Sequence, residues 1–183
     1  CTPIDNRLKM RDLSKPMGQI SAERAEHFDD IYEGMKDESG YFYGCHYSNP
    51  AIVIWFLTRL PPFNYLTWEL NNGWDAKDRM FKSISGAYIS ASTTNPTDVK
   101  ELIPEIYSIP MALTNESHLN CLPEKVKLPN TKDESEITPS LFVSMNRKFL
   151  EESSNLNLWI DLIFGYKQTG PEALKSKNIF LPT

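Results

Sequence analysis

Residues 159–168 read WIDLIFGYKQ and place one charge, Asp161, inside a run of large apolar side chains. The apolar residues recur at helical spacing, and most of the remaining positions are apolar as well. A helix that is apolar nearly all round has little face to offer to water. The pattern therefore predicts a buried helix that begins after Ser153 or Ser154 and runs to about Gln168. Its expected buried stripe consists of Leu156, Trp159, Ile163 and Tyr166.

Helices are also expected on both sides of this stretch. Downstream, Gly170-Pro171 restarts a short helix that ends near Lys177, because proline fits the first helical turn. Upstream, Thr138 followed by Pro139 starts another helix with one apolar face. That face consists of Leu141, Phe142, Met145 and Phe149.

The N-terminal half contains two further helix signals. Ser21 is a good N-cap, and apolar residues at spacings of three and four after it predict an amphipathic helix that ends between Gly34 and Gly40. Ser48 or Asn49, with proline at the next position, opens a core helix that runs through Leu60 until Pro61-Pro62 stops it.

The middle of the chain gives weaker signals. Residues 63–70 alternate loosely and predict a strand or a short helix. Asp75 can cap a helix that carries Met80, Phe81, Ile84 and Tyr88, and Thr97 can cap a short helix over 98–103. Residues 41–47 are aromatic and are expected to lie inside, whereas the polar stretch 115–138 is expected to be a surface loop.

Composition limits the classes of function. With 183 residues and 40% hydrophobic side chains, the chain holds one sizeable core. The net charge of −5 and the lack of a dense basic cluster argue against nucleic acid and against an anionic lipid surface as partners. Three cysteines without a paired spacing suit the cytosol. No apolar run is long enough to span a bilayer, so any membrane association is expected to be peripheral.

The residues with catalytic potential do not form a convincing constellation. Cys45-His46 together with His118 and Cys121 could supply four zinc ligands on paper, but adjacent residues in an extended segment point to opposite faces. For a similar reason His46 is poorly placed to activate Cys45 as a nucleophile. No nucleotide-binding or metalloprotease motif is present. The sequence therefore predicts no enzyme, no metal and no cofactor.

Charges set among apolar residues or prolines are the more informative feature. A buried charge must be paired, so we expect at least one charge of the segment RDLSKP (11–16) to pair with a distant residue, most naturally Glu101, Glu105 or Asp161. Such residues either tie the core together or form a polar surface for a partner. The candidate residues are Arg11, Asp12, Lys15, His46, Asn49, Lys100, Glu101, Glu105, Asp161 and Lys167.

The same segments carry a family resemblance. RDLSKPMG (11–18), YGCHYSNP (43–50), TDVKELIPE (97–105) and WIDLIFGYKQTGPEA (159–173) resemble, in order and spacing, the hallmark blocks of BEACH domains. RLPPF (59–63) and DRMFKSI (78–84) also look like sequence of this family. The loop around 116–137 is shorter than is usual in the family.

The resemblance implies a predominantly helical α+β fold with irregular extended segments in its core. It also implies a single domain over 1–183, as an incomplete BEACH domain that lacks the N-terminal helical portion and the extreme C-terminus. The resemblance further implies a non-enzymatic scaffold within a large cytosolic protein that acts in vesicle and lysosome traffic and in autophagy. There the domain follows a PH-like domain and precedes WD repeats, which would be its partners along with other trafficking proteins. A less favoured alternative is an enzyme of unfamiliar type that uses His46 with Asp12 or Glu101 as acid and base.

Overall fold

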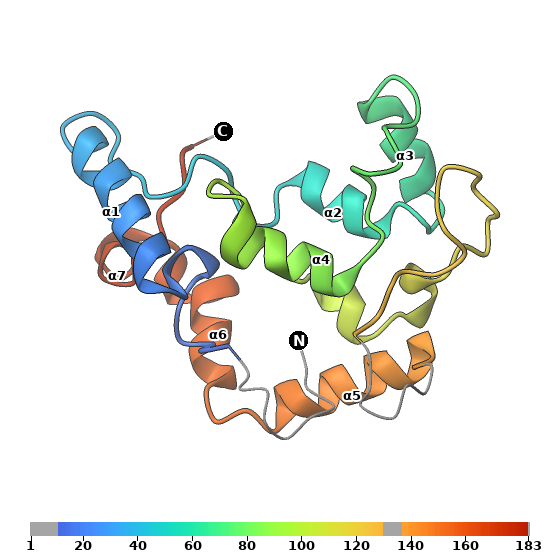
Figure 1. Ribbon diagram of the computed structural model, residues 1–183. Coiled ribbons are helices and arrows are strands. Elements are labelled where there is room, and N and C mark those ends of the chain that lie inside the picture. Colours follow the sequence, from blue (N-terminus) through green and yellow to red (C-terminus); the bar gives the residue numbers. More distant parts are fainter. Residues whose placement is uncertain (1–10, 130–136, 183) are drawn as a thin grey trace. The chain divides into compact units, whose positions relative to one another are not determined.

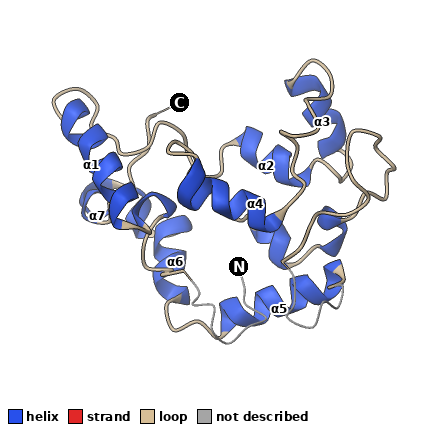
Figure 2. Cartoon of the chain, viewed as in Figure 1, coloured by secondary structure: helices blue, strands red, loops and turns tan. Residues whose placement is uncertain are grey.

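The computed structural model describes residues 11–129 and 137–182. The chain forms two compact units, each built from separated segments. Unit 1 is built from Ser48–Tyr88 and Leu102–Leu150, and unit 2 from Met10–Tyr47, Ile89–Glu101 and Glu151–Thr183. Figure 2 shows helices joined by loops in both units, with no strand drawn in the part of the chain that the structure describes. The expected predominantly helical fold is confirmed.

The α-helices of the two units are labelled in Figure 1. Those that fall wholly or mainly in unit 1 are α2 (Pro50–Leu57), α3 (Phe63–Leu70), α4 (Ile84–Ile89), the 3₁₀ turns η3 (Pro104–Tyr107) and η4 (Pro110–Leu113), and α5 (Pro139–Glu151). Those of unit 2 are η1 (Met17–Gln19), α1 (Ala22–Met35), the π-helical turn η2 (Ser90–Thr94), α6 (Leu156–Ile163), η5 (Tyr166–Gln168) and α7 (Gly170–Lys175). No described helix is both long enough and apolar enough to cross a membrane.

Local capping explains the helices that the sequence predicts best. The Ser21 side chain accepts the backbone N–H of Arg24 at the start of α1. The Asn49 side chain accepts the N–H of Ile52, with Pro50 at the first helical position of α2. In each case a side-chain oxygen satisfies a backbone donor that has no partner within the helix.

The core of unit 1 gathers residues from segments that are distant in sequence. The centre of this core is Phe56, Leu57, Phe81, Ile84, Ile103, Ile106, Ala112, Leu113, Val126, Ile137, Phe142 and Val143. Leu122 and Val126 anchor the described part of the 115–138 loop, and short backbone bridges join Ser83 to Lys127 and Thr114 to Lys125. Residues 130–136 of that loop lie outside the described residues.

Unit 2 is organised around buried aromatic rings, as expected for residues 41–47. Tyr43 packs edge-on against Phe28, with ring centroids 4.7 Å apart, and forms a backbone bridge with Phe180. A Cβ at Gly18 would lie 2.1 Å from Cε1 of Tyr43, so only glycine fits where the RDLSKPMG segment crosses this ring.

Two predicted helices are wrong. Residues 98–103 form no helix, because the Asp98 carbonyl accepts the Arg24 guanidinium and Ile103 precedes a proline. The helix predicted after Asp75 begins only at Ile84. Side chains bind the carbonyls of the intervening segment, since the Trp55 indole donates to Arg79 and the Arg59 guanidinium donates to Phe81.

The helix that contains Trp159 is shorter and less buried than predicted. It ends at Ile163, and Phe164 and Tyr166 are 59% and 58% exposed. The predicted burial of Trp159 and Ile163 is confirmed, whereas that of Tyr166 is wrong. A helix of this length buries one stripe, and both Phe164 and Tyr166 lie beyond its last residue.

Candidate functional site

The predicted charge network is centred in unit 2 on an ion pair between Arg11 and Glu101. Nη2 of Arg11 lies 2.7 Å from each carboxylate oxygen of Glu101, and the two side chains are 9% and 8% exposed. The expectation that a charge of the 11–16 segment pairs with a distant residue is confirmed. Burial raises the pKa of Glu101, while the Arg11 guanidinium and the Trp159 indole favour the ionised carboxylate and act in the opposite direction.

The 11–16 segment is shaped so that Arg11 can reach inward. Asp12 accepts hydrogen bonds from both the N–H and the hydroxyl of Ser14, and the Lys15 carbonyl accepts Nη1 of Arg11 at 3.2 Å. Those bonds to Ser14 hold the pKa of Asp12 below its usual value. Leu13 and Pro16 are buried and fix the segment in place, whereas Asp12 and Lys15 are exposed. Asp12 is therefore a turn residue and not a member of a buried pair.

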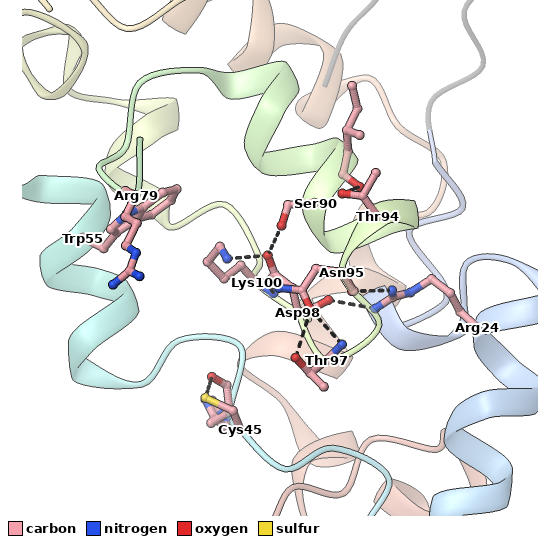
Figure 3. A network of polar contacts seen from close by, with 12 residues as sticks. Arg24, Cys45, Trp55, Arg79, Ser90, Thr94, Asn95, Thr97, Asp98 and Lys100 are labelled. Carbon is pink, nitrogen blue, oxygen red and sulfur yellow. Dashed lines mark hydrogen bonds and ion pairs between the residues drawn. The ribbon is translucent and has the colours of Figure 1, made fainter. Parts of the chain in front are cut away.

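A second cluster in unit 2 surrounds Asp98 (Figure 3). Oδ2 of Asp98 accepts a hydrogen bond from the Ser90 hydroxyl at 2.7 Å and forms an ion pair with Lys100. The Arg24 guanidinium donates to the carbonyls of Asn95 and Asp98 at 3.1 and 2.8 Å. Burial lowers the pKa of Arg24. These contacts join η2 and the 98–101 segment to α1.

The sequence prediction included Lys100 but missed the two other charged residues of this cluster, Arg24 and Asp98. Arg24 is on the buried side of α1, directly after the capping turn, and nothing in its local pattern separates it from the exposed charges of that helix. Asp98 was assigned to a helix that does not form. The only signal was that Asp98 and Lys100 stand beside Glu101 in one motif block.

A third group of contacts satisfies the carbonyls at the end of α6. The Tyr47 hydroxyl donates to the Ile163 carbonyl at 2.7 Å, and the Gln168 amide contacts the same carbonyl. The Asn178 amide donates to Leu162 and Lys167 at 2.9 and 3.0 Å. The last carbonyls of a helix have no partner within it, so these side chains serve as its C-terminal cap. Burial raises the pKa of Tyr47.

His46 lies among aromatic rings. Its ring centroid is 4.1 Å from that of Tyr47 and 4.6 Å from that of Phe180. Burial lowers the pKa of His46 and so favours the neutral imidazole.

The lowered pKa of His46 leads to a pH prediction. The unfolded chain binds this proton more readily, so the stabilising contribution is present above the unfolded pKa of about 6.5 and is lost as the pH falls through the folded pKa. We expect the urea midpoint of wild type to fall more between about pH 7.5 and about pH 5.5 than that of His46→Phe, which keeps an aromatic ring but does not titrate. Parallel pH profiles of the two proteins would contradict this assignment.

The remaining candidate residues do not converge on one site. Asn49 is the cap of α2 in unit 1, and Glu105 is half-buried in η3 of unit 1. Asp161 is half-buried on α6, and Lys167 places its ammonium 5.8 Å from the centroid of the Tyr166 ring. Neither Glu105 nor Asp161 has an ion-pair partner among the described residues. Of the three acidic residues expected to pair with the 11–16 segment, Glu101 is therefore the one that does so among the described residues.

Residues 11–129 and 137–182 contain no group of three His, Cys, Asp or Glu side chains that could hold a metal ion. Cys45 places its Sγ 3.6 Å from the carbonyl oxygen of His46.

Comparison with known proteins identifies the family. The Beige/BEACH domain family matches residues 3–183. The chain is 40% identical over 183 residues to BEACH domain-containing protein B of Arabidopsis thaliana, with 93% of this chain and 7% of the relative covered. It is 41% identical to human WD repeat- and FYVE domain-containing protein 4 over 94% of this chain, and 38% identical to BEACH domain-containing protein lvsE of Dictyostelium discoideum over 97%. It spans 6% and 9% of these two relatives. With matches over nearly its whole length, the chain belongs to the BEACH domain family.

Proposed function

We propose that this chain acts as a non-enzymatic protein-interaction scaffold within a large cytosolic protein of vesicle or lysosome membrane traffic, or of autophagy. Its partners are a preceding PH-like domain and following WD repeats of the parent protein, together with other trafficking proteins. Its place is the cytoplasm, with peripheral association at endosomal or lysosomal membranes.

The observation that carries this proposal is that the buried carboxylates of the motif blocks are bound by cationic side chains of the same chain. Arg11 engages Glu101, and Lys100 engages Asp98, so the buried carboxylates of these blocks already have cationic partners. A general acid or base needs a carboxylate that is accessible to substrate, whereas a scaffold needs a rigid framework that presents a surface.

The relatives also support a scaffold role. Human WD repeat- and FYVE domain-containing protein 4 carries two other domain types in its name, and the chain covers 6% of it. A module that is a small part of a long multidomain protein is well placed to bring neighbouring domains and partners together.

The alternative enzyme would use His46 with Asp12 or Glu101 as acid and base. The contacts of these residues disfavour it, because Asp12 is bound to Ser14, Glu101 is bound to Arg11, and the His46 ring is packed against Tyr47 and Phe180.

The proposal predicts that the exposed charges of the 11–16 segment contribute to partner binding. We expect the swap Asp12→Lys with Lys15→Glu to weaken capture of trafficking proteins about tenfold or more, because the net charge is kept but its pattern is inverted. The measurement is a quantitative pull-down from cytosol with the chain as bait, with bound proteins identified by mass spectrometry.

A matched control is available on α1. Glu33 and Lys36 form an exposed ion pair, so Glu33→Lys with Lys36→Glu makes an equivalent swap on another surface. This control should capture the same proteins as wild type. Equal losses in both swaps, or no protein captured above an empty bait, would refute the assignment of this segment as a partner surface.

A further inference from the structure

Four buried polar atoms of unit 2 have no hydrogen-bond partner within the part of the chain that the structure describes. They are Nε2 of Gln19, Nε of Arg24, Oδ1 of Asp29 and the hydroxyl oxygen of Tyr43. A polar atom that is buried without a partner costs free energy, and native proteins satisfy nearly all such atoms with protein groups or with bound water. If the four atoms lie together, they therefore mark a binding site.

Two of these residues pack on the Phe28 ring of α1, and a third follows it in the sequence. The Tyr43 ring meets Phe28 edge-on, with ring centroids 4.7 Å apart. The guanidinium carbon of Arg24 lies 5.3 Å from the centroid of the same ring. The two terminal nitrogens of Arg24 donate to backbone carbonyls (Figure 3), so Nε is the nitrogen that remains for the site. Asp29 is the next residue after Phe28, and its Oδ2 is bound to Lys177 at 2.5 Å, which leaves Oδ1.

The fourth residue, Gln19, approaches the Tyr43 hydroxyl from η1. A Cβ at Gly18 would lie 2.8 Å from the hydroxyl oxygen of Tyr43, so the backbone of η1 passes directly beside that oxygen. Burial raises the pKa of Tyr43 and keeps its hydroxyl protonated. The Gln19 amide opposes this rise, the Asp29 carboxylate adds to it, and the Arg24 guanidinium opposes it. The three side chains therefore act on one buried hydroxyl group and lie close to it.

The chemistry of these atoms matches water. The nitrogens of Gln19 and Arg24 are donors, Oδ1 of Asp29 is an acceptor, and the Tyr43 hydroxyl can be either. A buried water molecule forms about three hydrogen bonds and both accepts and donates them, so it is the complement of this set. The guanidinium disfavours a cation, and the carboxylate disfavours an anion. A larger organic molecule does not reach the site, because Tyr43 is 1% exposed.

We propose that at least one structural water binds among Gln19, Arg24, Asp29 and Tyr43. It accepts hydrogen bonds from the nitrogens of Gln19 and Arg24, and it donates to Asp29 and to the Tyr43 hydroxyl. Gln19 directly follows the RDLSKPMG segment, so this water joins the end of that motif block to α1 and to the aromatic segment 41–47. The water site is independent of the protein partners proposed above.

The test is the magnetic contact between water and the chain, measured by NMR in solution. We expect water cross-peaks at the Nε–H of Arg24 and at the side-chain amide of Gln19, with opposite signs in NOE and ROE spectra. Opposite signs identify a long-lived bound water, whereas proton exchange gives the same sign in both spectra. Tyr43→Phe with Gln19→Leu removes two of the four polar groups and should abolish the cross-peak at Arg24. This double variant should also lower the amplitude of deuterium relaxation dispersion by about one long-lived water per chain.

Tyr47→Phe is the matched control, because it removes another buried hydroxyl of unit 2 that already has a protein partner. The Tyr47 hydroxyl donates to the Ile163 carbonyl at 2.7 Å, and the Gln168 amide contacts the same carbonyl. This control should therefore keep both the water cross-peaks and the relaxation amplitude of wild type.

The outcomes decide the proposal directly. Water cross-peaks that are present in wild type, lost in the double variant and kept in the Tyr47 variant support it. Absence of these cross-peaks in wild type, or equal relaxation amplitudes in the double variant and the Tyr47 variant, overturns it. The measurement on wild type decides the proposal even where a variant does not fold.

Discussion

Replacing Arg11 with alanine is expected to lower the free energy of unfolding by about 3 to 5 kcal/mol. The reason is that the Glu101 carboxylate would stay buried after losing the guanidinium that lies 2.7 Å from both of its oxygens. Uptake of a proton by Glu101 would recover part of this cost, in the direction of its raised pKa. Urea denaturation at neutral pH measures the change.

Three companion variants define what the Arg11 result means. Arg11→Met with Glu101→Leu removes both charges and should cost less than Arg11→Ala alone, because no buried charge remains. Asp12→Ala and Lys36→Ala remove exposed charges and should stay within about 1 kcal/mol of wild type. Lys132, a natural loop control, lies outside the described residues. If Arg11→Ala and Lys36→Ala had equal denaturation midpoints, the pair would contribute nothing to the fold.

The Trp159→Ala variant is expected to lose about 3 to 5 kcal/mol of stability. The Trp159 side chain is 5% exposed, and its ring meets that of Phe164 edge-on at 5.9 Å. Truncation removes this apolar area and leaves a cavity beside the Arg11–Glu101 pair, whose carboxylate the indole helps to stabilise. The urea midpoint measured by circular dichroism reports the loss.

The next residue on the same helix provides the matched control for Trp159. Ile160 is 44% exposed, so Ile160→Ala should cost well below half of the Trp159→Ala effect. Trp159→Phe keeps most of the apolar packing but removes the indole N–H, so it should fall between wild type and alanine. Similar losses for Trp159→Ala and Ile160→Ala would show that α6 does not use Trp159 as its core side chain.

The two largest expected effects concern side chains that both act on the Glu101 carboxylate. Arg11, Glu101 and Trp159 derive from three separate motif blocks, and in unit 2 they come together at one buried carboxylate. Double-mutant analysis of Arg11→Ala with Trp159→Ala should therefore give a loss that differs from the sum of the single losses by at least about 0.5 kcal/mol.

The sequence by itself determined those elements whose causes are local. Ser21 caps α1 and Asn49 with Pro50 begins α2, because a helix start is decided by one side chain and the three or four residues after it. The pairing of the 11–16 segment with Glu101 was also within reach, since three charges beside a proline leave no regular exposed face for all of them. The family followed from the order of several long motif blocks.

Only the tertiary structure decided which side chains form hydrogen bonds with the backbone carbonyls outside and at the ends of the helices. Residues 98–103 form no helix because Arg24, more than 70 positions away, donates to the Asp98 carbonyl. The helix that contains Trp159 stops at Ile163, where Tyr47 and Asn178 supply hydrogen-bond donors to its last carbonyls. These partners are distant in sequence, so no local pattern of apolar spacing or capping residues reveals them. The same holds for Phe164 and Tyr166, whose exposure depends on where the helix ends and not on their own hydrophobicity.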